Sequence, residues 1–240
     1  ETELPVWESV IGNLRFIDEQ YADSTLREDF RAYARLLLRS AFDRVGWEPR
    51  ADEESEVVLL RHRLISDLAA LGDPAVTPEA RRRFAALVRD RAAVPAALRE
   101  PIARAVAYSA DRQIYDDLLR LAREQDNEQE RMFYYNALAG ARATELIEQT
   151  VQVALRDPKL PPAQILPFLE QAAKESGDPD RVWRLVFANR NEILGRLSGL
   201  QRQQALSRIA RASANPMVAL ELRWADLTRA DRGMRRFADE

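Results

Sequence analysis

The feature that most constrains the fold is a helix-stop signal that recurs along the chain. Gly72-Asp73-Pro74 is repeated at Gly177-Asp178-Pro179, and Asp157-Pro158 is a partial third copy. Each residue type has a defined place at a helix boundary. Glycine follows the end of one helix, aspartate caps the next, and proline is tolerated at its first position. The signal therefore divides the chain into short helices joined by short loops.

Helical periodicity fills the segments between these stops. Within 25–45, apolar residues recur at helical spacing, and Gly46 followed by Pro49 ends the helix. We expect Trp47 to pack back onto the helix that it follows. Helices are predicted over 4–20, 25–45 and 53–71, then near 79–91, 96–109, 112–125, 128–141, 144–155, 163–175, 180–188, 191–197 and 200–212, with a last one from Pro216.

The arrangement of these segments predicts an all-α fold, because no alternating pattern of useful length indicates a strand. Helix pairs of about 30 to 40 residues favour a HEAT/armadillo-like α-solenoid of antiparallel helix pairs. No linker is long enough to separate two domains, so residues 1–240 are expected to form a single superhelical domain. Glu1 stands where a start methionine would, and we expect the chain to be part of a longer protein.

Composition excludes several classes of protein. The chain is 46% hydrophobic and 31% charged, which is typical of an ordered protein, and no apolar run approaches the ~20 residues that span a membrane. The absence of cysteine excludes disulfides and thiol nucleophiles and is compatible with the cytoplasm, where we expect the protein. Acidic and basic residues interleave to a net charge of -3, so we expect neither nucleic acid nor membrane as a partner.

The chemistry of a hydrolase is missing from this sequence. His62 is the only histidine, whereas a helical zinc site needs two histidines four residues apart. No nucleophile elbow, phosphate loop or dinucleotide fingerprint occurs. We therefore assign no catalytic and no metal-binding residue, expect no cofactor in this chain, and leave the substrate-binding residues unknown. His62 lies outside the apolar arc of its helix, and we expect it to be a surface residue.

Arg61, Arg99 and Arg131 all fall on apolar helix faces. An unpaired buried charge costs several kcal/mol, so each of them needs a partner. The structural interpretation is an ion pair between helices or a clamp on a helix end. The functional interpretation is a cation that lines a cavity and holds a carboxylate. We favour the structural interpretation.

Some aromatic residues of this chain resemble ligand contacts, but we expect them to lie in the hydrophobic core instead. They are Tyr134, Tyr135, Trp7, Trp183 and Trp224.

A series of short motifs follows in order along the chain. They are Phe30-Arg31-Ala32-Tyr33-Ala34-Arg35-Leu36-Leu37, Gly46-Trp47, Leu59-Leu60-Arg61, Glu79-Ala80-Arg81-Arg82-Arg83-Phe84, Val94-Pro95-Ala96-Ala97-Leu98-Arg99, Glu130-Arg131 before Ala137-Leu138, and Val182-Trp183 before Asn191-Glu192-Ile193-Leu194. In this order they resemble the C-terminal domain of zinc aminopeptidases of the puromycin-sensitive, aminopeptidase N and endoplasmic-reticulum type. The resemblance spans positions 4 to about 200, although Arg190 stands where the family often has an aromatic residue.

The resemblance implies a HEAT-like helical domain that follows a catalytic domain, closes over its active site and forms much of the cavity that receives the peptide. The zinc and the catalytic residues then belong to that N-terminal catalytic domain, which becomes a partner together with the peptide substrate. The alternative is a free-standing α-solenoid scaffold that binds a protein in its groove. On either interpretation we expect this chain alone not to be an enzyme.

Overall fold

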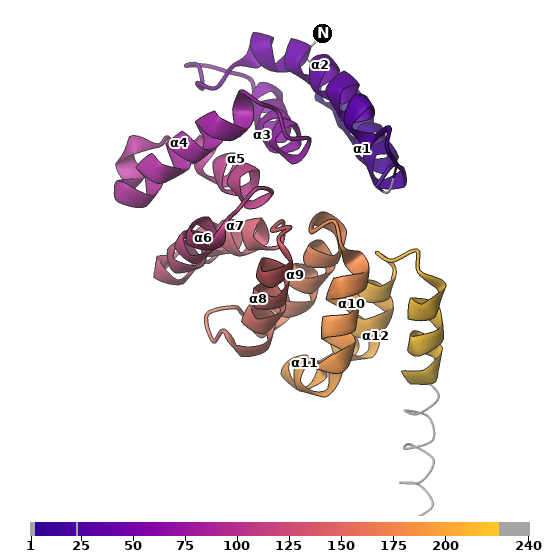
Figure 1. The fold of residues 1–240 in the computed structure, drawn as a ribbon. Coiled ribbons are helices and arrows are strands. Elements are labelled where there is room, and N and C mark those ends of the chain that lie inside the picture. The colour runs from indigo at the N-terminus through magenta and orange to yellow at the C-terminus, as the bar shows by residue number, and fades with distance from the viewer. Residues whose placement is uncertain (1–2, 23, 226–240) are drawn as a thin grey trace, which may run out of the picture. The chain divides into compact units, whose positions relative to one another are not determined.

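A computed structural model describes residues 3–22 and 24–225, and all of the regular structure in these two ranges is helical (Figure 1). This confirms the all-α fold. The backbone forms two compact units, residues 1–138 and 139–240, and each is described separately below. Whether the chain behaves as the single domain predicted from the sequence stays a prediction.

Within residues 3–22 and 24–138, the first unit contains seven α-helices, most of which contact the helices one or two places along the chain. Helix α3 packs against α1, α2, α4 and α5, and α5 packs in turn against α7. Contacts restricted to near neighbours are what an α-solenoid requires, so the predicted solenoid fits this unit. The helices are α1 (Leu4–Gln20), α2 (Arg27–Val45), α3 (Ser55–Ala70), α4 (Val76–Arg89), α5 (Ala96–Ala107), α6 (Arg112–Glu124) and α7 (Glu128–Leu138), with a short 3₁₀ helix η1 (Arg91–Ala93) before α5.

The second unit is built in the same way around α9, which contacts α8, α10 and α12. Trp183 of α10 is buried there, and its indole Nε1 donates to Glu221 at 2.6 Å. The helices are α8 (Thr144–Arg156), α9 (Pro162–Glu175), α10 (Pro179–Ala188), α11 (Arg190–Arg196) and α12 (Gly199–Ala210), followed by a helix that is described over 216–225.

The predicted stops explain the helix ends. Gly46, with φ of 70°, follows α2, and its N–H donates to the Phe42 carbonyl. The ring of Trp47 then packs edge-on against that of Phe42, with centroids 5.6 Å apart, as expected. At the second Gly-Asp-Pro signal, the Asp178 carboxylate accepts from the N–H of Arg181 at 2.9 Å and α10 begins at the proline.

The first Gly-Asp-Pro signal behaves differently from the prediction, because α4 does not begin at its proline. The Asp73 carboxylate accepts from the N–H groups of Ala75 and Val76, both at 2.9 Å, and so closes a turn before the helix. Pro74 lies in this turn, and α4 starts at Val76. Asp73 is also paired with Arg39 of α2. The same tripeptide therefore makes a direct cap in one unit and a capped turn in the other.

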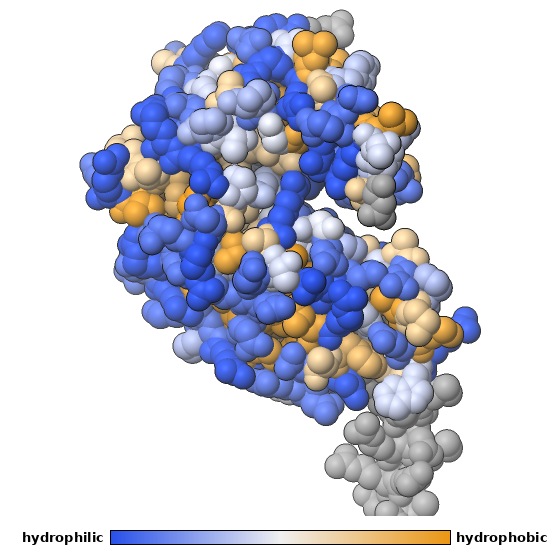
Figure 2. Space-filling model, viewed as in Figure 1, coloured by the Kyte–Doolittle hydropathy of each residue, from blue (hydrophilic) through white to orange (hydrophobic). Residues whose placement is uncertain are grey.

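The surface in view is mostly hydrophilic, with apolar side chains scattered among charged ones (Figure 2). Phe16 and Leu36 of the first unit, and Leu200 and Trp224 of the second, are among the exposed large apolar residues. No described helix combines the length and the low charge needed to cross a membrane.

Candidate functional site: a charged pocket between α1, α3 and α5

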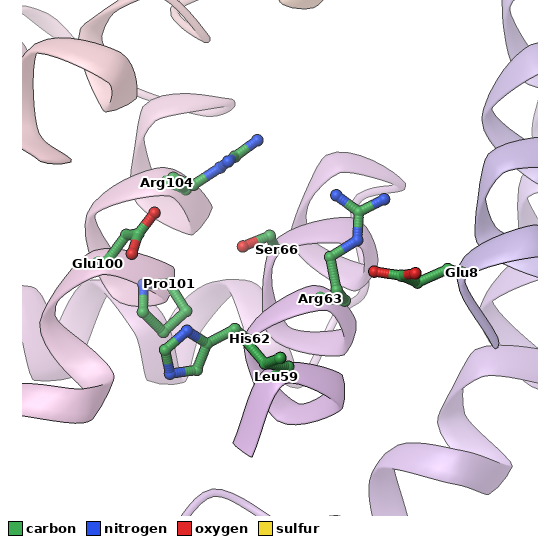
Figure 3. A pocket seen from close by; sticks show the side chains of 8 residues that line it. All are labelled: Glu8, Leu59, His62, Arg63, Ser66, Glu100, Pro101 and Arg104. Carbon is green, nitrogen blue, oxygen red and sulfur yellow. The ribbon is translucent and has the colours of Figure 1, made fainter. Parts of the chain in front are cut away.

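One pocket lies wholly within the first unit (Figure 3). Positions spaced three and four apart share a face of a helix, so the side chains from α3 line one wall and those from α5 line another. Glu8 reaches the pocket from α1. The lining residues are Glu8, Leu59, His62, Arg63, Ser66, Glu100, Pro101 and Arg104.

Helix α3 turns its side chains toward α1 on one side of the pocket and toward α5 on the other. Arg63 extends beside Glu8, whereas the His62 ring lies next to Pro101 (Figure 3). The side chain of Ser66 stands between these two sides and points into the space between the helices. The pocket thus joins charges from three helices that are far apart in sequence.

A buried acid stands next to this wall. Asp67 of α3 is only 2% exposed and pairs with Arg15 of α1, with a closest N–O distance of 3.5 Å. It also pairs with Arg63 at 3.8 Å, which is an ion pair but too long for a hydrogen bond. A buried carboxylate is stable only when cations compensate its charge. The two ion pairs of Asp67 therefore join α1 to α3 and restrict the Nε end of the Arg63 side chain.

His62 is not the surface residue that the sequence predicted. It is half-buried against α5, and its Nε2 is buried without a hydrogen-bond partner. Burial lowers the pKa of the imidazole below its usual value, and the nearby Glu100 carboxylate opposes this shift. His62 also meets the backbone of Ala97, whose carbonyl lacks its usual helical donor because Pro101 has no N–H. The ring is therefore held neutral at pH 7 between two helices.

Arg61, on the opposite side of α3, confirms the structural interpretation. Its side chain is fully buried and donates to the carbonyl oxygens of Gly46 at 3.0 Å and Val45 at 3.2 Å. It also forms a bidentate pair with Glu53, in which Nη1 donates to Oε2 at 2.6 Å. This pairing lowers the pKa of the Glu53 carboxyl. All three guanidinium nitrogens are engaged, so Arg61 clamps the end of α2 to the segment that leads into α3.

Arg99 and Arg131 are clamps of the same type. Arg99 donates to the carbonyls of Val94 and Arg91, both at 3.2 Å, and pairs with Glu130 of α7 at 3.2 Å. Arg131 donates to the Gln125 carbonyl at 2.8 Å, beyond the end of α6. Both side chains are only partly exposed. Arginines on the apolar faces of this unit thus bind carbonyl groups near helix ends, which carry partial negative charge.

The aromatic predictions hold for all but two residues. Tyr134, Tyr135 and Trp183 are each 1% exposed or less, as expected of core residues. Trp7 is only half-buried. Trp224 is 55% exposed, so its assignment to the core was wrong.

The family resemblance places the zinc in a separate catalytic domain rather than in this chain. Within residues 3–22 and 24–225, no group of three or more histidine, cysteine or acidic side chains is placed to hold a metal ion. The chain has one histidine and no cysteine.

Comparison with known proteins agrees with the motifs. A family profile described as the ERAP1-like C-terminal domain matches residues 1–223. The chain belongs to this family. It is similar to Aminopeptidase M1-A of Oryza sativa subsp. japonica (32% identity over 127 residues, 50% of this chain and 14% of that protein) and to Aminopeptidase M1 of Arabidopsis thaliana (30% over 129 residues, 50% and 14%). A third relative, Aminopeptidase M1-B of Oryza sativa subsp. japonica, is 28% identical over 167 residues, which are 65% of this chain and 19% of that protein.

The matched segments of this ERAP1-like C-terminal domain cover 14 to 19% of the length of these relatives. Most of each relative therefore lies outside the matched region. The family resemblance inferred from short motifs is confirmed, since the profile covers nearly the whole chain.

The pocket of this ERAP1-like C-terminal domain was not foreseen from the sequence. One signal was present, because Leu59, His62, Arg63 and Ser66 repeat at helical spacing and place a second, polar face on α3. A second signal was Pro101 inside a predicted helix, since it frees a carbonyl group. Neither signal identifies the helices that pack against α3, so Glu8, Glu100 and Arg104 could not be assigned to the pocket.

Proposed function

We propose that this chain is the non-catalytic C-terminal domain of a zinc-dependent aminopeptidase, where it closes over the active site and shapes the cavity that receives the peptide. The observation that carries the proposal is the family match over residues 1–223, together with relatives that are named aminopeptidases. In this proposal the zinc and the catalytic residues belong to an N-terminal catalytic domain, which is the partner of this chain.

The chemistry of the described residues supports a non-catalytic role. The buried charges around α2 and α3 serve to join helices, as the Arg61–Glu53 pair does. The single histidine has a lowered pKa and no carboxylate within hydrogen-bonding distance to orient it as a base. A domain of this kind contributes surface and shape to a peptide cavity rather than reacting groups.

The first test concerns the chain alone. Purified chain should hold no stoichiometric zinc and should not cleave an aminoacyl anilide, because it has one histidine and no cysteine. Metal analysis and the anilide assay measure both properties. Zinc bound at one ion per chain, with turnover that is lost in His62→Ala, contradicts the proposal.

The second test uses the complete parent protein. Its gene should encode a His-Glu-x-x-His motif upstream of Glu1. A parent protein truncated before Glu1 should retain cleavage of a small aminoacyl anilide if its catalytic domain remains folded, yet lose its dependence on peptide length. The anilide is the matched control, since it does not need the cavity. A gene whose reading frame starts near Glu1 supports the alternative, a free-standing solenoid scaffold.

A further inference from the structure

The pocket between α1, α3 and α5 carries balanced charges of both signs. Arg63 and Arg104 supply two positive charges, and Glu8 and Glu100 supply two negative ones. His62 adds none at pH 7, because burial lowers the pKa of its imidazole. Among the described residues, neither Glu8 nor Glu100 forms an ion pair within 4.0 Å. Both carboxylates therefore remain available to a cationic group of a ligand.

Ser66 is a second, independent sign of a ligand. It is only 7% exposed, and its hydroxyl points into the pocket (Figure 3). Within 3–22 and 24–225, this hydroxyl makes no hydrogen bond to another residue. Because the hydroxyl faces the open pocket, it is placed to hydrogen-bond a ligand there.

The size of the pocket limits what can enter. Its volume is about 190 Å³, which is below the ~300 to 1,000 Å³ of sites for drug-sized molecules. Leu59, which is 51% exposed, and Pro101 add an apolar wall to the charged groups. A fitting ligand is thus small, carries both charges and has an aliphatic part.

We propose that this pocket binds a free α-amino acid with an aliphatic side chain. The carboxylate is held by the guanidinium group of Arg63, and the ammonium group by the carboxylate of Glu100. The Ser66 hydroxyl hydrogen-bonds the ligand between these charges. The aliphatic side chain packs on the wall formed by Leu59 and Pro101, and binding is non-covalent.

This inference goes beyond the proposed function, because binding requires only the first unit of this chain. Where the proposed function also holds, a free amino acid is the product that the aminopeptidase releases. The pocket then gives the parent protein a means to bind its own product.

The experiment titrates the 240-residue chain with L-leucine by isothermal titration calorimetry. Two analogues each carry only one of the two charged groups. L-leucinamide keeps the ammonium group, and N-acetyl-L-leucine keeps the carboxylate. We expect saturable binding of L-leucine at one site per chain. Each analogue should bind at least about tenfold more weakly, because it leaves one set of pocket charges unpaired.

Variants then locate the site. Glu100→Gln should weaken L-leucine binding about tenfold and leave the weak binding of N-acetyl-L-leucine unchanged, since that analogue has no ammonium group. Ser66→Ala should weaken L-leucine binding by a smaller factor. Glu56→Gln is the matched control, because Glu56 is exposed on α3 and does not line the pocket. Melting curves of each variant verify that it folds.

Three results overturn the proposal. Equal binding of L-leucine and N-acetyl-L-leucine, insensitive to Glu100→Gln, means a site for anions only. Binding of L-leucinamide as tight as that of L-leucine means a site for cations only. No saturable binding of L-leucine by the folded chain removes the site altogether. Each of these results concerns the isolated chain, so none depends on whether the parent protein is an aminopeptidase.

Discussion

Arg61 and Arg63 lie two residues apart on α3 and have opposite environments. Arg61 is fully buried, and every nitrogen of its guanidinium group donates to an oxygen of the fold. The side chain of Arg63 is 36% exposed, and its ion pair with Asp67 spans 3.8 Å. The first arginine is a structural clamp, and the second retains donors that a ligand can use. Unused hydrogen-bonding capacity, rather than charge itself, therefore distinguishes a binding group from a packing group on this helix.

The largest expected effect tests whether α3 has the orientation that this comparison requires. Leu64→Asp places a charge where the side chain is fully buried, and we expect it to lower the free energy of unfolding by more than about 4 kcal/mol. Leu59→Asp is the control, because Leu59 is 51% exposed at the rim of the pocket. Urea denaturation measures both. Equal losses at the two positions contradict the described orientation of α3.

The second prediction applies one substitution to both arginines. Arg61→Met leaves Glu53 and two carbonyl groups buried without their donor, which should cost about 3 to 5 kcal/mol. Arg63→Met should cost about 0 to 1 kcal/mol, because Asp67 keeps its pair with Arg15. Urea denaturation of the two variants gives the difference directly. A loss for Arg63→Met as large as that for Arg61→Met makes both arginines structural and removes the distinction.

The third prediction places Arg99 between these extremes. Its guanidinium group holds two carbonyls and Glu130, but its side chain is 16% exposed and Glu130 keeps a second partner in Arg91. Arg99→Met should therefore cost about 1 to 3 kcal/mol, which is the range for leaving a hydrogen-bonding group unsatisfied. Thermal melting should rank the variants in the order Arg61→Met, Arg99→Met, Arg63→Met. Any other order means that burial does not set the strength of these clamps.

The clamps show what the sequence could and could not predict. Helical spacing placed Arg61, Arg99 and Arg131 on apolar faces, and the cost of an unpaired buried charge required partners. Spacing alone cannot identify those partners, because they belong to segments that meet only in the folded chain. Glu53 and the carbonyl of Gly46 are near Arg61 in sequence, whereas Glu130 is 31 positions from Arg99.

The error on His62 has a related cause. The prediction assumed that α3 has one buried face and that the opposite side meets solvent. In the structure α3 packs against four helices, so a residue outside the first apolar arc meets a second neighbour, α5. The same error hid the pocket, since His62, which lines it, was assigned to the solvent side. For a helix that packs against several neighbours, the buried residues have to be predicted by considering every face of the helix.

The smallest expected effect concerns the protonation of His62. It tests whether the face of α3 that packs on α5 is buried enough to make the stability depend on pH. Burial lowers the pKa of the imidazole in the folded chain, whereas the unfolded chain keeps the ordinary value near 6.5. Between these two values the unfolded state binds more protons, so stability rises with pH. The contribution is fully present above about pH 6.5 and is lost as the pH falls through the folded pKa. The charged groups around the ring are Glu8 on α1, Arg61 and Arg63 on α3, and Glu100 and Arg104 on α5.

His62→Gln removes this dependence without adding a charge. Melting temperatures measured from pH 7.5 down to pH 5.5 should fall for the unaltered chain and fall less for His62→Gln, by a difference smaller than the loss caused by Arg99→Met. His62 is the only histidine of the chain. Burial raises the pKa of the Asp18 carboxyl, but hydrogen bonds from Arg31 and Arg27 outweigh this effect and hold its pKa at about 2. Asp18 therefore titrates below the pH range of the experiment. Identical curves mean that the ring is solvated and that the side of α3 facing α5 is open. A steeper fall in His62→Gln reverses the sign and means that the folded chain prefers the protonated ring, as expected if Glu100 outweighs burial.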